Sequence, residues 1–264
     1  MPQRKEAVLE YQNVKGERVP SLGLGTYRLT GGTCVEAVAR ALSMGYRHVD
    51  TAHMYGNEAE VGRGMEESGV ERGEIFLTTK VWPSDYEHER VVRKTRESLE
   101  KLRTGYVDLL LMHWPGDGVP LGETLGAMRE LQDERSVRHI GVSNFSPSLV
   151  DEATEHAEVF CNQVEYHVYR PQDGILDQAR ASDYLLVAYR PLSRGNVGND
   201  ATLQEIGAAH GKTASQIALR WLVQQEKVSA IPKATGDEHL KSNLDVFDFE
   251  LSEEEMDRVS SLGR

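Results

Sequence analysis

The sequence predicts an α/β protein: a single (β/α)8 barrel of the TIM type over residues 1–264, with a short β-hairpin in front of it. The first observation behind this prediction is a recurrence, because six of the seven distances between successive ends of apolar runs are 22 to 33 residues. One strand-plus-helix unit has about that size, and eight units make a barrel of roughly 250 residues. The runs end near Leu24, Asp50, Lys80, His113, Ser143, Glu165, Tyr189 and Pro232.

The second observation is the character of the apolar runs. Residues 107–112 are too uniformly apolar to alternate, as expected of a strand that is covered on both faces. An open doubly wound sheet is the alternative fold, and it usually carries a glycine-rich first turn. Residues 23–28 lack the third glycine of that turn, and no Walker A sequence occurs in the chain.

Local patterns place individual elements in chain order. We expect residues 8–20 to form the hairpin and to plug the bottom of the barrel. Apolar residues at helical spacing predict helices over 86–102 and 213–223. Ser146, which precedes a proline, is the expected N-cap of another helix, and Ser252 begins a capping-box sequence at the start of the last one.

Composition restricts the classes of protein that the chain can represent. The 264 residues are 39% hydrophobic, which is enough for a core, and the net charge of −12 argues against nucleic-acid binding. We expect no signal peptide, no membrane helix and no disulfide framework, with Cys34 and Cys161 serving as packing residues. These features predict a soluble cytoplasmic protein. We also expect a monomer, because no predicted helix has an apolar face beyond the one that packs on the barrel.

Ionisable residues close several of the apolar runs. Polar groups at the C-terminal ends of barrel strands are typical catalytic positions, and Asp50, Lys80 and His113 stand there, with Tyr55 in the loop after Asp50. Taken singly, each has a structural explanation: Asp50 could cap a turn, and His113 could be a core histidine. A buried lysine, however, needs a partner charge.

Together the four residues suit carbonyl reduction. That reaction needs a hydride donor and a proton donor, and Tyr55 can supply the proton. We expect the Lys80 cation to lower the Tyr55 pKa from its free value of about 10. Asp50 would hold Lys80 in place and charged, and His113 would orient the carbonyl group.

Six segments resemble, in the same order, the aldo-keto reductase family, and in particular its short microbial members of the 2,5-diketogluconate reductase type. The first segment, residues 45–58, contains the Asp-Thr-Ala-His-Met-Tyr-Gly-Asn-Glu run around Tyr55. The others are 79–82, 113–115, 140–145, 162–167 and 231–233.

The resemblance implies NADP(H) as cofactor, with Asp50, Tyr55, Lys80 and His113 as a catalytic tetrad. It implies that Ser143, Asn144 and Gln163 hold the nicotinamide carboxamide and that Tyr189 stacks on its ring. The phosphates would lie near the loops after strands 7 and 8. The other residues implied to bind the cofactor are Thr26, Leu192, Ser193, Arg194, Lys233, Ala234, His239 and Asn243.

Two positions depart from the family pattern. Ala234 stands where serine or threonine is common, and His239 stands where an arginine commonly meets the 2′-phosphate. A neutral histidine lacks the permanent charge and planar fork of arginine. We therefore expect NADPH to remain a cofactor and NADH, or NAD(H) generally, to be accepted, with less than about a thousandfold discrimination.

The substrate pocket is expected to be aromatic and open. Tyr27, Trp82 and Trp114 follow strands 1, 3 and 4, and His53 lies close to Tyr55. The chain ends soon after the last predicted helix, without the longer C-terminal segment of larger relatives. An open pocket favours small or varied carbonyl compounds such as dicarbonyls, aldehydes, keto sugars and keto esters.

Two other functions compete with this interpretation. A Schiff-base aldolase would use Lys80 as its nucleophile, but it would not need Tyr55 or the Ser143–Asn144–Gln163 set. A cofactor-binding barrel without catalysis would not require all four tetrad residues, so their joint presence argues against that function. We expect a small-molecule carbonyl substrate, and neither a metal ion, a nucleic acid nor a membrane as partner.

Overall fold

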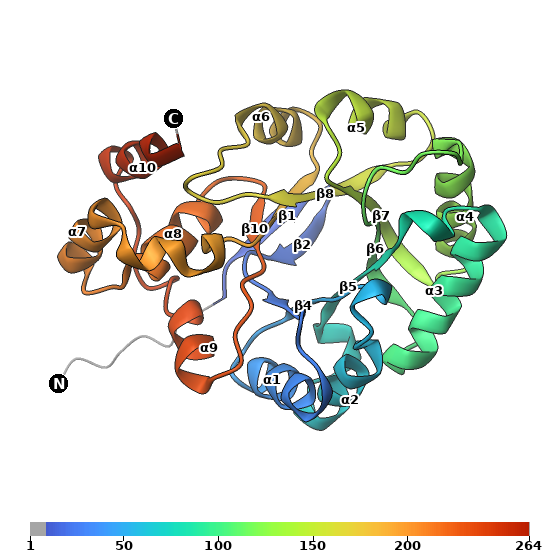
Figure 1. Cartoon of the computed structure of the whole chain (residues 1–264), viewed down its shortest axis with the longest axis horizontal. Coiled ribbons are helices and arrows are strands. Elements are labelled where there is room, and N and C mark those ends of the chain that lie inside the picture. The colour runs from blue at the N-terminus through green and yellow to red at the C-terminus, as the bar shows by residue number, and fades with distance from the viewer. Residues whose placement is uncertain (1–8, 264) are drawn as a thin grey trace.

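A computed structural model describes residues 9–263 and shows a barrel of eight parallel strands surrounded by helices (Figure 1). The strands neighbour one another in chain order from β3 to β10. Leu22, just ahead of β3, forms a parallel bridge with Ala230 of β10, so the first and last strands meet and the barrel closes. The strands are β3 (Leu24–Gly25), β4 (His48–Asp50), β5 (Phe76–Val81), β6 (Val107–Met112), β7 (Val137–Ser143), β8 (Val159–Glu165), β9 (Leu185–Tyr189) and β10 (Val228–Ala230).

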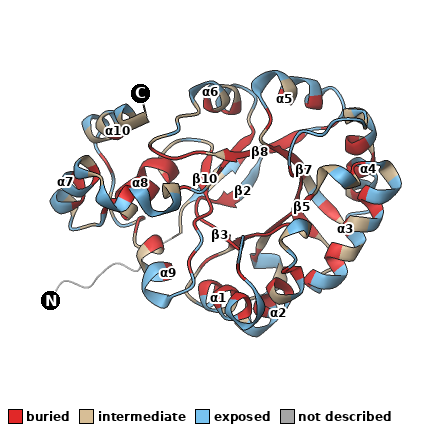
Figure 2. Cartoon of the chain, in the orientation of Figure 1, coloured by how far each residue is buried: buried red, intermediate tan, exposed pale blue. Residues whose placement is uncertain are grey.

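Helices cover the outside of the barrel and turn their buried faces toward the strands (Figure 2). The 43-residue interval before the last strand holds two helices, α7 and α8, which explains why it is longer than the others. None of the described helices is both long and apolar enough to span a bilayer. The helices are α1 (Gly31–Ser43), α2 (Glu58–Ser68), α3 (His88–Leu102), α4 (Leu121–Asp133), α5 (Pro147–Thr154), α6 (Asp173–Ala181), α7 (Ala201–His210), α8 (Ala214–Val223), α9 (Asp237–Leu244) and α10 (Glu253–Ser260).

The expected hairpin is present as β1 (Tyr11–Val14) and β2 (Glu17–Pro20), while residue 8 lies outside the described part of the chain. Val14 and Val19 are fully buried in one cluster with barrel residues such as Leu109. Lys227, which precedes β10, donates its Nζ to the main-chain oxygen of Asn13. The hairpin therefore covers the N-terminal end of the barrel, as the sequence predicts.

Most of the predicted helix boundaries are confirmed, and two details are corrected. Ser146 caps α5, and Ser252 caps α10 in a full capping box. The helix predicted from residue 86 begins at His88, because Tyr86 follows a short 3-10 turn and turns its side chain into the protein. The α8 helix is buried on nearly every side rather than on one face, since it lies between β10 and the additional helices α7 and α10.

His48 of β4 is a fully buried histidine in the barrel interior. Its Nε2 lies 3.2 Å from the Thr78 hydroxyl, and its Nδ1 has no hydrogen-bond partner. Burial lowers the His48 pKa to about 4. The folded protein therefore keeps His48 neutral at pH values where the unfolded chain binds a proton.

We predict that His48 makes the fold sensitive to mild acid. The unfolded chain protonates this group near pH 6.5 and the folded chain only near pH 4, so stability is lost as pH falls through that window. The loss should approach about 3 kcal/mol, measured by urea unfolding at a series of pH values. His48→Gln should flatten the pH dependence between those limits. An unchanged slope in the variant would contradict the assignment to His48.

Candidate active site

A buried ion pair joins the C-terminal ends of β4 and β5. Lys80 Nζ lies 2.5 Å from Asp50 Oδ1 and 2.8 Å from the main-chain oxygen of Thr51, and both charged residues are 1% exposed. Burial alone lowers the pKa of Lys80, but the Asp50 carboxylate and the Tyr55 hydroxyl together outweigh burial and hold that pKa above its ordinary value. Lys80 is therefore a permanent cation beneath the site.

Tyr55 lies directly over this ion pair. It ends the 3-10 turn His53–Tyr55, and its hydroxyl is 3.4 Å from Lys80 Nζ. Burial raises the pKa of Tyr55 and the Lys80 charge lowers it, with burial prevailing. The expected lowering of this pKa is thus wrong in net direction: desolvation of the phenolate exceeds the attraction of the nearby cation, and Tyr55 keeps its proton near neutrality.

His113 completes the cluster from the end of β6. Its ring lies edge-on to Tyr55 and Trp82, with centroid distances of 5.6 and 5.0 Å. Burial, helped by the Lys80 charge, lowers the pKa of His113 to about 3, so the imidazole is neutral. Nδ1 is buried without a hydrogen-bond partner. An orphaned N–H is rarer than an orphaned acceptor, which favours the tautomer with its proton on Nε2.

The four predicted tetrad residues therefore come together around one point. Asp50, Lys80 and His113 approach from three successive strands, and Tyr55 approaches from the loop after the first of them. The neutral phenol and the neutral imidazole can each donate a hydrogen bond, while Lys80 supplies fixed positive charge. Such an arrangement can bind an oxygen atom, protonate it and stabilise the phenolate that remains.

Amide and hydroxyl groups from β7, β8 and β9 form a second cluster beside the first. Asn144, in the left-handed region at φ 64°, accepts a hydrogen bond from the Tyr189 hydroxyl at 2.8 Å and donates to Ser143 Oγ at 3.0 Å. Gln163 donates Nε2 to Asp50 Oδ2 at 2.8 Å. This amide links the second cluster to the ion pair, a connection that sequence reasoning did not anticipate.

The second cluster has the donor set that a nicotinamide carboxamide needs. Among the described residues, no hydrogen bond occupies Oε1 of Gln163, and Nε2 has a second hydrogen to donate. Oδ1 of Asn144 accepts one hydrogen bond and has room for another. An amide ligand requires acceptors for its N–H groups and a donor for its oxygen, so these residues fit it.

The other residues expected at the cofactor come after strands β3, β9 and β10, and two of them, His239 and Asn243, belong to helix α9. Thr26 is buried and donates its hydroxyl to the main-chain oxygen of Asp50 at 3.0 Å. Leu192, Ser193 and Arg194 follow β9, and the last two have positive φ angles. Of the residues after β10, Lys233 and His239 are exposed whereas Ala234 and Asn243 are buried.

Three of the loops that follow barrel strands carry exposed apolar side chains. Tyr27 is 41% exposed and Trp114 43%, and the Tyr27 ring lies 5.0 Å from the Tyr55 ring. Met54, which immediately precedes Tyr55, is also exposed. His53 is mostly buried, and its Nδ1 lies 3.5 Å from Glu58 Oε2. These positions are consistent with an aromatic wall, with His53 facing the scaffold through Nδ1.

Sequence reasoning assigned no role to Asn57 and Glu58, which the structure makes the support of the Tyr55 loop. The Asn57 amide donates to the main-chain oxygens of Thr26 and Leu29, both at 2.9 Å. The buried Glu58 carboxylate accepts from Thr79 Oγ1 at 2.7 Å. Both residues lie inside the segment that carries the family resemblance, so their position in that motif was the available signal.

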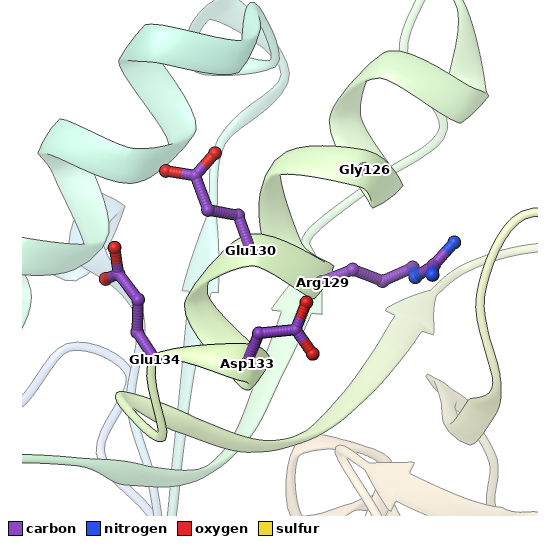
Figure 3. A pocket seen from close by; sticks show the side chains of 5 residues that line it. All are labelled: Gly126, Arg129, Glu130, Asp133 and Glu134. Atoms are coloured by element: carbon purple, nitrogen blue, oxygen red, sulfur yellow. The ribbon is translucent and has the colours of Figure 1, made fainter.

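Other surface features lie away from this cluster. A shallow depression on the outer side of α4 is lined by charged side chains and contains none of the predicted site residues (Figure 3). Across residues 9–263, no group of three or more His, Cys, Asp or Glu side chains could hold a metal ion. Cys34 and Cys161 are buried free thiols, as expected of packing residues.

Comparisons with known proteins agree with the geometry. The model of the Aldo/keto reductase family matches residues 21–264. A glyoxal reductase of Bacillus subtilis is 38% identical over 252 residues, covering 94% of this chain and 91% of that protein. The methylglyoxal reductase DkgB of Salmonella typhimurium is 37% identical, covering 92% and 93%. A crystal structure assigned as a 2,5-diketo-D-gluconic acid reductase B has a TM-score of 0.95 at 45% identity, covering 98% and 93%.

We predict that Lys80→Met destabilises the fold strongly. It leaves the Asp50 carboxylate buried without its cation, and breaking a buried pair in this way costs about 3–5 kcal/mol. Urea unfolding measures the loss. Adding Asp50→Asn removes the unpaired charge and should restore part of the stability. A Lys80→Met protein as stable as wild type, or a double variant less stable than the single one, would contradict this account.

Proposed function

The chain belongs to the aldo/keto reductase family, and from that premise we propose that it reduces small aldehydes and ketones to alcohols with Tyr55 as the proton donor. Membership makes it an oxidoreductase that acts on carbonyl groups. The observation that carries the residue assignment is the contact of Tyr55 with a lysine that is held charged by Asp50. A phenol next to a permanent cation can give up its proton in a low-dielectric site.

The proposed chemistry divides among the four residues. A reduced nicotinamide, when bound, supplies the hydride that reaches the carbonyl carbon. The neutral His113 would donate a hydrogen bond from Nε2 to the carbonyl oxygen and orient it. Tyr55 would pass its proton to that oxygen as negative charge develops there, and Lys80 would stabilise the resulting phenolate. Asp50 keeps Lys80 charged and fixed.

Gln163, Ser143 and Asn144 would hold the carboxamide of that nicotinamide, with Tyr189 against its ring. Their free hydrogen-bonding capacity supports this role. Because Gln163 also donates to Asp50, the same amide would fix the distance between the hydride donor and the proton donor. Thr26, Leu192 and Asn243 would line the rest of the cofactor site.

The Schiff-base alternative is not favoured by the geometry. A nucleophilic lysine must be a neutral amine, whereas Asp50 and Tyr55 hold the pKa of Lys80 above its ordinary value. Lys80 also directs Nζ to Asp50 and to the main-chain oxygen of Thr51. A barrel that only binds a cofactor would not require a tyrosine hydroxyl beside a buried lysine, as Tyr55 lies beside Lys80.

For the cofactor, we propose NADPH with NADH also accepted. The exposed Lys233 and Arg194 would meet the phosphates of either cofactor. His239, also exposed, would give the 2′-phosphate only a weak contact, and Ala234 has no hydroxyl to donate. The discrimination between the two cofactors would therefore be modest.

For the substrate, we propose small carbonyl compounds, dicarbonyls among them. Tyr27, Trp82 and Trp114 would form the aromatic wall, with His53 beside it. The names of the glyoxal and methylglyoxal reductases that resemble this chain support the same class. We further propose that residues 1–264 work as one domain, as a monomer, in the cytoplasm.

Replacing Tyr55 by phenylalanine tests the proton donor. The substitution keeps the ring and removes the hydroxyl, so kcat for methylglyoxal reduction should fall at least about a hundredfold. The rate is followed as loss of NADPH absorbance. Tyr184→Phe is the matched control, since Tyr184 is a buried tyrosine that precedes β9 at the opposite end of the barrel and belongs to neither cluster of the site. Equal rates for wild type and Tyr55→Phe would refute the assignment.

Cofactor preference is tested with His239→Arg. We expect wild type to favour NADPH over NADH by less than about a thousandfold in kcat/KM, equivalent to roughly 4 kcal/mol. The arginine should increase that preference about tenfold by adding a permanent charge that can contact the 2′-phosphate. A larger wild-type preference, or no response to His239→Arg, would show that another residue holds this phosphate.

A further inference from the structure

Tyr86 is a buried tyrosine between β5 and α3 whose hydroxyl contacts the loop after β6. The side chain is 2% exposed. Its hydroxyl donates to the main-chain oxygen of Trp114 at 2.6 Å and accepts from the Trp114 N–H at 3.3 Å. One phenol therefore satisfies both main-chain polar groups of the residue that follows His113.

Two further contacts hold the loop after β6 and the Tyr86 segment in place. A Cβ on Gly116 would lie 2.6 Å from Cδ2 of Tyr86, so the loop main chain rests directly on the ring. Thr124, in the first turn of α4, donates its hydroxyl to the main-chain oxygen of Tyr86 at 2.9 Å. The loop is thus fixed between the Tyr86 segment and the start of α4.

His113 depends on its main chain for alignment, because its ring has little else to hold it. Nδ1 has no hydrogen-bond partner, and the ring is bounded by edge contacts with Tyr55 and Trp82. The main chain is fixed by the His113 N–H, which donates to Val81 O at 3.0 Å, and by Asn144 Nδ2, which donates to His113 O at 3.2 Å. Tyr86 adds the constraint on the following peptide.

We propose that Tyr86 is a positioning residue for carbonyl reduction: its hydroxyl fixes the His113–Trp114 main chain and so aligns the imidazole and the Trp114 wall with Tyr55. This inference rests on the proposed function and deepens it. The loop that carries the carbonyl-orienting histidine also carries the most exposed part of the aromatic wall. Loss of the Tyr86 hydroxyl should therefore affect both turnover and substrate selection.

Tyr86→Phe tests the proposal, with Tyr184→Phe as its matched control. Tyr184 is also buried, and its hydroxyl also has two main partners within hydrogen-bond distance, the acceptors Ile175 O at 3.1 Å and Gln178 Oε1 at 2.9 Å, but it precedes β9 at the opposite end of the barrel. Kinetics of the full chain with NADPH would compare methylglyoxal with benzaldehyde. We expect Tyr86→Phe to lower kcat about tenfold or more for both, and to raise KM more for the bulkier benzaldehyde. The control should stay within about twofold of wild type.

A second readout needs no turnover. NMR titration of the His113 imidazole, assigned with His113→Asn, should show an upward shift of its pKa in Tyr86→Phe, because a looser loop admits water. Tyr184→Phe should leave it unchanged. Equal kinetics and titration in Tyr86→Phe and wild type, or equal losses in both variants, would overturn the positioning role. If the wild type reduced neither aldehyde, the proposed function would be overturned instead. The His113 titration would still test whether Tyr86 fixes the His113 loop.

Discussion

The ion pair between Asp50 and Lys80 is the interaction on which the rest of the site depends. Two opposite charges lie at the ends of neighbouring strands and are almost completely removed from water. Either charge alone would be costly there, so each requires the other. Tyr55 lies on the cation, and Gln163 donates to the second oxygen of the carboxylate. The pair therefore joins the Tyr55 side of the site to the side whose amides suit a nicotinamide.

Loops rather than strands carry the groups that would touch a substrate, and buried polar residues hold those loops. Asn57 ties the Tyr55 loop to the loop of Tyr27, and Tyr86 ties down the peptide after His113. These supports are hydrogen bonds from side chains to main-chain atoms, and they fix a loop without requiring additional buried apolar residues. A rigid ring of eight strands makes this possible, because each loop starts from a position that its neighbours already fix.

Much of the fold follows from the sequence, because the spacing of apolar runs and the cap residues are local signals. The hairpin, the strand ends and the caps at Ser146 and Ser252 were predictable for that reason. The convergence of Asp50, Lys80, His113 and Tyr55 was predictable because parallel strands end on one face. The direction of the Tyr55 pKa was not, since it depends on how much burial opposes one nearby charge. The hydrogen bond from Gln163 to Asp50 joins two residues that are 113 positions apart in the sequence, and the one from Tyr86 to Trp114 joins two that are 28 positions apart. No local sequence pattern indicates contacts between such distant positions.

The pH dependence of kcat/KM for carbonyl reduction tests the central claim most directly. In this account, a neutral His113 and a protonated Tyr55 act together over a charged Lys80. Burial holds the His113 pKa at about 3 and the Tyr55 pKa above its ordinary value. The rate constant should therefore stay level through neutrality and fall only in strong alkali, as Tyr55 loses its proton. A limb near pH 6.5, where an unperturbed histidine titrates, would contradict the account.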